Sequence, residues 1–308
     1  MKRFLRVFLS IFMGIGSLVL LYSYCIISKQ EFNTFGYNLS EPEKRFVLPT
    51  VLNEISGITT INKTQIACVQ DEIGTIYIYD LAKASIVKEY TSEVKGDFEE
   101  IALVDSTMYL LRSDGVIIEQ THYSEKSAKR KEYNLDLPSD NNEGLCYDKK
   151  NNRLLIAAKS KAGKGYKNNE FRLIYSFDLN DKTARPKQIF KLKIEEIEAK
   201  AVSLNIAIPY KTIKKTGEQI SDFYFRPSAI SIHPFDHLIY ILSSKDKLLL
   251  IMDDNGIIKN LIALDPVLFN KAEGITFLPN GDMLISNEAQ KGKPTLLKFK
   301  YHKRKQVE

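Results

Sequence analysis

The chain has 308 residues, of which 44% are hydrophobic and 27% are charged, an ordinary composition for a globular protein. Its net charge of +6 arises from 44 Lys and Arg against 38 Asp and Glu, and the basic residues are scattered through polar segments. A nucleic-acid-binding surface would need a basic stripe interleaved with stacking aromatic residues, and no segment has that pattern. We therefore exclude nucleic acid as a partner and expect one large domain or two small ones.

The N-terminal segment predicts a membrane anchor. After a basic start at residues 1–6, residues 7–27 contain no charged side chain. At about 1.5 Å per residue this run spans roughly 31 Å, the hydrocarbon thickness of a bilayer. Lys2, Arg3 and Arg6 precede the run, so the positive-inside rule leaves the N-terminus in the cytoplasm. We interpret residues 7–27 as a single-pass signal anchor in the inner membrane, with the rest on the periplasmic or extracytoplasmic side.

Two other interpretations of this segment stay open. A cleaved signal peptide has an apolar region of only about 7–15 residues and a small-x-small cleavage site, which residues 22–30 do not offer. A lipoprotein signal ending at Cys25 would need a small residue in front of the cysteine, where Tyr24 stands. Residues 28–43 then form a polar linker.

Beyond the linker, the sequence repeats itself. Five similar segments align on Gly57, Glu100, Gly144, Ala229 and Gly274, at separations of 43, 44, 85 and 45 residues. Each is followed by two more short apolar runs, and fourth runs are visible too, with turn signals such as DDNG and LPNGD between them. A period near 44 residues with four short strands is typical of a β-propeller, in which the first strand of each blade lines the central channel.

Five first strands predict an all-β, five-bladed propeller over residues 44–303, followed by a basic tail at 304–308. The 85-residue gap could hide a sixth blade, but about residues 193–225 lack the repeat pattern and begin with a helix-like stretch. We interpret them as an insertion and keep six blades as the alternative. The last blade has only three strands, so we expect KRFVLP, residues 44–49, to supply its fourth. A β-sandwich would explain short strands but not the period.

The repeated segments also carry a family resemblance. EISGIT, NNEGLCYD, PSAISIHP with HLIYILSS, AEGITF with ISNE, and GDFEEIA for a family motif GDFEGIA resemble the SdiA-regulated family of bacterial envelope proteins over about residues 44–300. The resemblance implies a five-bladed propeller, distantly similar to NHL-repeat propellers, behind an N-terminal membrane segment. It also implies a bound calcium ion and no established biochemical activity. The chain departs from the family at Glu100, where the family favours Gly.

The residues that precede the alignment points predict a binding site. They are Ser56, Glu99, Glu143, Ser228 and Glu273. Equivalent positions in a propeller form a ring at one end of the channel, so three carboxylates and two hydroxyls should converge there. This anionic, oxygen-only set suits Ca²⁺ better than zinc, which would want His or Cys. We predict a calcium site at Glu99, Glu143 and Glu273; alternatively, each glutamate caps a backbone N–H of the next blade and water fills the channel.

A second layer of residues should surround this ring. The second strand of each blade runs back to the same face, so the residues that end the second strands form a rim around the channel. Glu72 and Glu288 are among them, and we expect both to tune the metal site. Lys159 belongs to the same rim, and the loop at 160–170 should add Lys161, Lys164 and Lys167. The lysines could equally be solvated loop charges.

Two classes of function remain open. The first is a non-catalytic module, tethered to the inner membrane, whose calcium site fixes the central face for an unknown small-molecule or protein ligand. The second is a calcium-assisted hydrolase of an anionic phosphoester or a lactone. The sequence shows no evident nucleophile–base pair and no histidine at the ring face, so we favour binding and leave open whether the protein is an enzyme.

Overall fold

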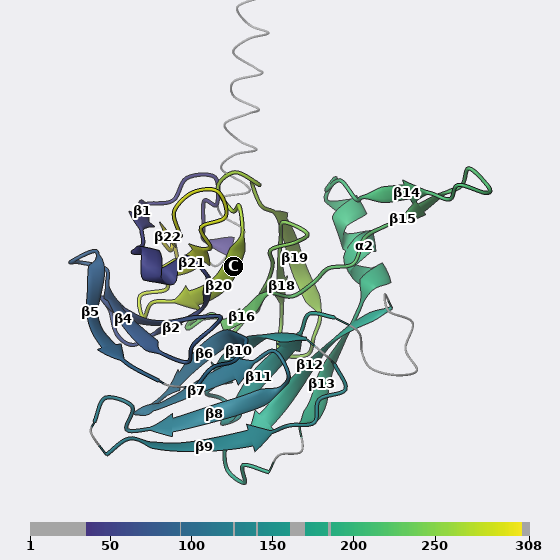
Figure 1. Cartoon of the computed structure of the whole chain (residues 1–308). Coiled ribbons are helices and arrows are strands. Elements are labelled where there is room, and N and C mark those ends of the chain that lie inside the picture. The colour runs from purple at the N-terminus through teal and green to yellow at the C-terminus, as the bar shows by residue number, and fades with distance from the viewer. Residues whose placement is uncertain are drawn as a thin grey trace, which may run out of the picture.

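The computed structural model describes residues 35–303, apart from residues 93, 126, 140, 161–169 and 184–185. In this part of the chain, five four-stranded antiparallel sheets surround a central channel, and one two-stranded sheet lies outside them (Figure 1). The prediction of an all-β, five-bladed propeller is confirmed, and the alternative of six blades is wrong. Residues 7–27 lie outside the described residues, and within these no helix is long and apolar enough to cross a membrane.

The first three blades follow one another along the chain, and each is a meander that runs outward from the channel. They consist of β2 (Ile55–Thr60), β3 (Gln65–Gln70), β4 (Ile76–Asp80) and β5 (Ser85–Tyr90), then β6 (Phe98–Val104), β7 (Thr107–Arg112), β8 (Val116–Thr121) and β9 (Lys129–Asn134), then β10 (Asn142–Asp148), β11 (Arg153–Ala158), β12 (Phe171–Asp178) and β13 (Lys187–Lys193).

The last two blades include the ring closure. The fourth blade contains β16 (Ala229–Ile232), β17 (Ile239–Ser243), β18 (Leu248–Met252) and β19 (Ile258–Ala263). The fifth contains β20 (Ala272–Phe277), β21 (Met283–Asn287) and β22 (Thr295–Phe299), and its outer strand is β1 (Lys44–Val47). β1 pairs antiparallel with β22, with Phe46 opposite Leu296. The expectation that residues 44–49 complete the last blade is therefore confirmed.

The segment between the third and fourth blades forms a small unit of its own. It contains α2 (Ile194–Ser203), then the two-stranded sheet of β14 (Tyr210–Thr212) and β15 (Gln219–Ser221), which projects from the propeller in Figure 1. The helix buries Ile194, Ile197 and Ala201 in an apolar cluster shared with the third and fourth blades. This spacing of apolar residues places one face of the helix on the propeller.

The apolar core lies between the blades. Five clusters of buried side chains each combine residues of two neighbouring blades. β17 and β18 are buried along their whole length, because the middle strands of a blade are covered on both faces. Outer strands such as β9, with the sequence KRKEYN, are mostly exposed. The hydrophobic sequence of a strand therefore follows its place in the blade.

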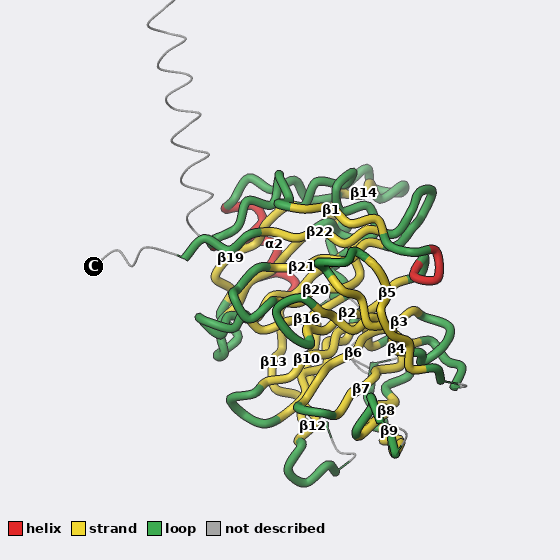
Figure 2. Tube along the Cα trace, turned by 90° about the vertical axis from the view of Figure 1, so that its left-hand side faces the viewer, coloured by secondary structure: helices red, strands yellow, loops and turns green. Residues whose placement is uncertain are grey.

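Strand direction defines two faces of the propeller. The inner strands are β2, β6, β10, β16 and β20, which contact one another in a closed ring. We call the end of the channel where they begin the mouth, and the opposite end the base. In the side view of Figure 2 the 3-10 helix η1 (Thr50–Leu52), which precedes β2, lies on the mouth side at the right, and the C-terminal end of the described chain lies on the base side at the left.

Candidate binding site at the channel mouth

A β-bulge at the start of four inner strands builds the site. In β2, β6, β10 and β20, the register with the second strand slips by one residue at the second position of the strand. The extra residues are Ser56, Glu99, Glu143 and Glu273, four of the five residues that the repeat predicts for the ring. A bulged residue has no partner in the ladder and its side chain is re-aimed. In these four blades, the repeat thus encodes a β-bulge that frees one side chain at the mouth.

The glycines that follow the bulges bring the inner strands close together. A Cβ atom on Gly57 would lie 2.5 Å from the Cα atom of Glu100, and one on Gly274 would lie 3.3 Å from the backbone nitrogen of Ile58. Because adjacent inner strands approach this closely, the bulged side chains of neighbouring blades are confined to a narrow opening.

Glu143 and Lys159 form the ion pair at the centre of the site. Lys159 follows β11 directly, and its backbone N–H donates to the carbonyl oxygen of Asn141 at 3.0 Å, which holds it beside the start of β10. Its ammonium group contacts the carboxylate of Glu143, whose side chain is almost fully buried. Burial raises the pKa of Glu143, although the charge of Lys159 acts in the opposite direction. Burial lowers the pKa of Lys159, but the charges of Glu143, Glu273 and Glu99 outweigh it and leave that pKa raised.

Glu99 and Glu273 share the electrostatic field of this pair. Burial, followed by the negative charges of Glu143 and Asp97, raises the pKa of Glu99 to about 9. Burial and the charge of Glu143 raise the pKa of Glu273 to about 7, although Lys159 and Lys271 oppose the shift. Three carboxyl groups from three blades therefore interact with one another, and Lys159 interacts with all three. Burial and mutual repulsion therefore favour the protonated forms of Glu99 and Glu273.

The two serines of the predicted ring are used by the backbone. The hydroxyl of Ser56 donates to the carbonyl oxygen of Glu54 at 3.1 Å. The hydroxyl of Ser228 donates to the carbonyl oxygen of Ala272 at 3.1 Å and accepts from the N–H of Ser244 at 3.2 Å. Ser228 thus ties the fourth blade to the fifth, and Ser244 in turn hydrogen-bonds Glu273. The predicted ring therefore has fewer available ligands than expected. Its three carboxyl groups remain, but its two hydroxyls are engaged in hydrogen bonds to the backbone.

Glu100, the residue that departs from the family pattern, has a structural role. Its Oε1 atom accepts hydrogen bonds from the N–H of Ile58 at 2.9 Å and the N–H of Ile101 at 3.1 Å. It fills the space that Gly57 leaves open and links the first two blades. Burial raises its pKa well above the ordinary value, and its Oε2 atom has no hydrogen-bond partner among the described residues. Glu100, which is not one of the three ring glutamates, thus caps one backbone N–H of the preceding blade and one of its own.

The two rim glutamates differ in position. Glu288 pairs with Lys271, and burial raises its pKa, with a further contribution from the charge of Glu273. It therefore lies within electrostatic reach of the site. Glu72 is exposed, and its charge acts on Asp71, whose pKa is raised to about 6 by burial, Glu54, Glu288 and Glu72 in that order. Glu54 was not anticipated from the sequence; it lies two residues before the bulge of β2.

Lysines from the fourth blade and the loop before β20 complete the rim. Lys247 donates to the carbonyl oxygens of Phe269 at 3.0 Å and Asn270 at 2.6 Å. Burial lowers its pKa, against the charge of Glu273. Lys161, Lys164 and Lys167 lie outside the described residues. The mouth therefore mixes acids and lysines as expected, but only Lys159 contacts an acid of the ring among the described side chains.

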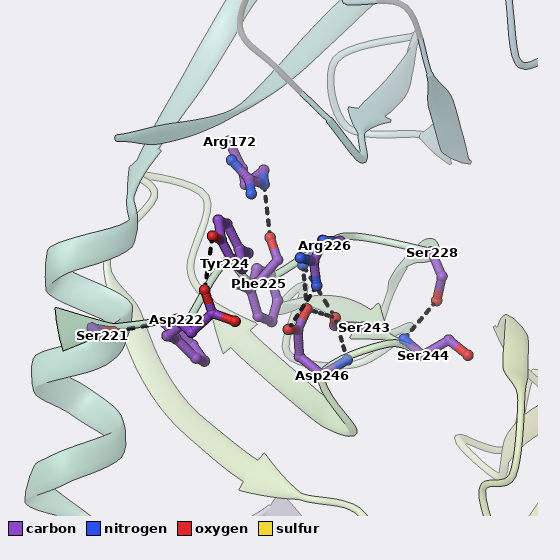
Figure 3. A network of polar contacts seen from close by, with 11 residues as sticks. Arg172, Ser221, Asp222, Tyr224, Phe225, Arg226, Ser228, Ser243, Ser244 and Asp246 are labelled. Carbon is purple, nitrogen blue, oxygen red and sulfur yellow. Dashed lines mark hydrogen bonds and ion pairs between the residues drawn. The ribbon is translucent and has the colours of Figure 1, made fainter. Parts of the chain in front are cut away.

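A polar network anchors the insertion beside the mouth (Figure 3). The carboxylate of Asp246 accepts hydrogen bonds from the backbone N–H of Arg226 and the hydroxyl of Ser243, both at 2.7 Å. Arg172 on β12 donates to the carbonyl oxygen of Phe225 at 2.8 Å, and burial lowers its pKa to about 10. This network holds the chain that leads into Ser228 against both the third and the fourth blade.

The side chains at the mouth offer the type of ligand that calcium prefers, but fewer ligands than the ion needs. Carboxylate oxygens are the ligands that Ca²⁺ prefers, yet the ion takes about 6–8 of them. Among the described residues, no group of three or more His, Cys, Asp and Glu side chains is positioned to hold a metal ion. The ammonium of Lys159 occupies Glu143, which leaves Glu99 and Glu273 as the acids without a cationic contact within 4 Å in the described chain.

Comparisons with known proteins establish the fold alone. No family model and no curated protein matches the chain. Among solved structures, glutaminyl cyclase from Myxococcus xanthus has a TM-score of 0.54 at 12% identity, over 84% of this chain and 95% of that one. A streptogramin B lyase has a TM-score of 0.45 at 13% identity, over 83% of this chain and 97% of that one. At 12% identity, the likeness to the cyclase supports the propeller fold alone. The SdiA-regulated family stays a resemblance carried by its motifs.

Proposed function

We propose that the protein is a membrane-anchored, extracytoplasmic propeller that binds a cation at the channel mouth, with Ca²⁺ as the expected ion. In this proposal the bound cation completes a binding face for a small-molecule or protein ligand. The observation that supports it is the cluster of Glu99, Glu143 and Glu273, three acids on three blades that share the charge of Lys159. The proposed place of the protein is the inner membrane, held through residues 7–27.

The charge balance of the cluster explains why a cation would bind. If all three carboxyl groups ionised, one lysine would leave two negative charges uncompensated in a partly buried site. The raised pKa values of Glu99 and Glu273 favour neutralisation of these charges by protons. A divalent cation would replace the protons, so its affinity should rise with pH and its binding should release protons.

Glu99 and Glu273 are the residues that we expect to hold the ion, with Glu288 close enough to add charge. Glu143 would join them only if Lys159 turned away, because the ammonium and the ion compete for one carboxylate. When bound, calcium would supply a fixed positive charge at the mouth, where an anionic group of a ligand could bind. Lys159 therefore sets the affinity of the site from within the chain.

Thermal unfolding with added metal tests the proposal. A ligand that binds only the folded state at a hundredfold excess over its Kd stabilises it by about 2.7 kcal/mol. That corresponds to a rise in Tm of roughly 5–10 °C for a protein of this size. We expect the rise with calcium, less with magnesium, and more at pH 8.5 than at pH 6. Glu273→Gln should abolish it and Glu143→Gln should blunt it.

Variants of two lysines separate binding at the mouth from general ion effects. Lys159→Met should strengthen the response to calcium, because it removes the competing ammonium. The matched control is Lys131→Met. Lys131 is exposed on β9, the outer strand of the second blade, so its replacement should leave the rise in Tm with calcium unchanged. Identical melting curves in calcium and in chelator across this pH range would refute the proposal.

A calcium-assisted hydrolase is the second candidate, and one observation favours it. Burial and neighbouring carboxylates raise the pKa of Glu99 to about 9, whereas the ammonium of Lys159 contacts Glu143 and opposes the rise of its pKa. Different environments for two neighbouring carboxyl groups are how sites assign an acid and a base. With calcium bound, the substrate would be an anionic phosphoester or a lactone. Calcium-dependent turnover of a lactone that is lost in Glu99→Gln would favour catalysis over binding.

A further inference from the structure

The N-terminal segment that leads into the propeller is fastened to its base. We call residues 35–39 the strap. The hydroxyl of Tyr37 donates to the carbonyl oxygen of Gly281, in the turn between β20 and β21. The N–H of His302 donates to the carbonyl oxygen of Gly36 at 2.9 Å, which joins the strap to the end of the described chain. Both contacts lie at the base, because Gly281 follows the C-terminal end of the inner strand β20 and His302 follows the C-terminal end of β22, which runs in the same direction.

An aromatic cluster holds the strap in place. Tyr37 is 7% exposed, and its ring lies 6.2 Å from His233 and 5.4 Å from Tyr301, centroid to centroid. Gly36 has a φ of +78°, and a Cβ atom there would lie 2.6 Å from the Tyr301 ring. The strap therefore requires glycine at this position and seats a tyrosine in the fifth blade. Phe35 and Leu39 pack against the same apolar cluster.

The attachment point limits how the propeller can face a membrane. Residues 28–34 connect the predicted anchor to the strap, and seven residues reach at most about 25 Å when fully extended. An inner strand such as β20, with six residues, is about 20 Å long from mouth to base. If the mouth faced the bilayer, residues 28–34 would have to run from base to mouth along the outside of a blade and around its outer strand. That path takes up the whole of their extended length.

We infer that the base of the propeller, around the strap, faces the membrane and that the acidic mouth faces the aqueous compartment away from it. The inference rests on the anchor in the proposed function. It identifies the ligand of the mouth as a water-soluble species or a soluble protein, because lipid headgroups of the anchoring bilayer lie at the other end. Phe235, which is 54% exposed in the turn after β16, is then a side chain at the membrane-facing end.

Single cysteines at the two ends of two blades test the orientation in the full-length chain. Phe235 and Lys245 lie at the base and mouth ends of β17, and Ser106 and Asp114 lie at the base and mouth ends of β7. Each of the four residues would be replaced by cysteine singly, in a chain that also carries Cys25→Ser. Cys68 and Cys146 can stay, because both are buried. A fluorophore on the new cysteine would be read in liposomes that contain a headgroup-attached nitroxide quencher.

We expect the labels at positions 235 and 106 to be quenched at least threefold more than their partners at 245 and 114. Tyr37→Ala should reduce that difference, because a released strap lengthens the tether. Equal or reversed quenching within both pairs, in protein that floats with the liposomes, would overturn the orientation. Protein that fails to float with liposomes would instead refute the anchor, so the two failures are distinguishable. The pair on β7 decides the outcome if Phe235→Cys does not fold.

Discussion

Replacing Glu99 by glutamine tests the electrostatics of the mouth most directly. The folded protein holds the pKa of this carboxyl at about 9, mainly because the group is buried next to Glu143 and Asp97. In the unfolded chain the pKa of a glutamate is about 4.3. Between these two values the folded state binds one more proton than the unfolded state, so the free energy of unfolding falls as the pH rises.

The size of the effect follows from this difference in bound protons. One proton corresponds to about 1.4 kcal/mol per pH unit, so the titration of Glu99 costs about 2.7 kcal/mol of stability between pH 6 and pH 8. Glu273, with a pKa of about 7, adds a smaller loss below pH 7. Glu99→Gln removes the first contribution and keeps the second. The variant should therefore lose less stability with rising pH and be more stable than the natural protein at pH 8.

Denaturant unfolding at pH 6, 7 and 8 in the presence of chelator measures this slope. Groups outside the site cancel when the variant is compared with the natural protein at each pH. Glu132→Gln on β9, an exposed position, is the matched control and should follow the natural protein. Parallel stability curves for Glu99→Gln and the natural protein from pH 6 to pH 8 would refute the assignment of a buried, protonated Glu99.

Two further predictions concern the backbone frame of the site. Phe46→Ala on β1 should reduce the free energy of unfolding by about 3–5 kcal/mol, because Phe46 is buried in the strand that closes the ring. In the same denaturant titration, the control Val47→Ala should cost less than about 0.5 kcal/mol, because that side chain is 56% exposed. Gly57→Ala should cost at least about 1–3 kcal/mol, because its Cβ would lie 2.5 Å from the Cα atom of Glu100. Gly292→Ala, whose Cβ would have only one neighbour, at 3.7 Å, is the control, and equal melting temperatures for the two glycine variants would contradict the close packing of the inner strands.

Much of the site was predictable because it is repeated. Glu99, Glu143 and Glu273 stand at one place in the 44-residue period, and symmetry alone brings equivalent places together at one end of a propeller. The importance of Lys159 was harder to see, since one lysine among the rim residues has no distinguishing pattern. A signal was present in the strand register: Ala158 pairs with Asn142, so the next residue along lies beside the start of β10 and Glu143.

The sequence by itself determined the five repeated segments, the strand that closes the ring and the level of the channel at which the acids lie, because these depend on periodicity and strand direction. Tertiary structure decided the rest. It turned Ser56 and Ser228 to backbone carbonyls, placed Glu100 between two blades and seated Tyr37 at the base. These outcomes depend on distances between segments far apart in the chain. A periodic pattern carries no information about such distances, so the division of the polar groups between binding and packing became visible only in the folded protein.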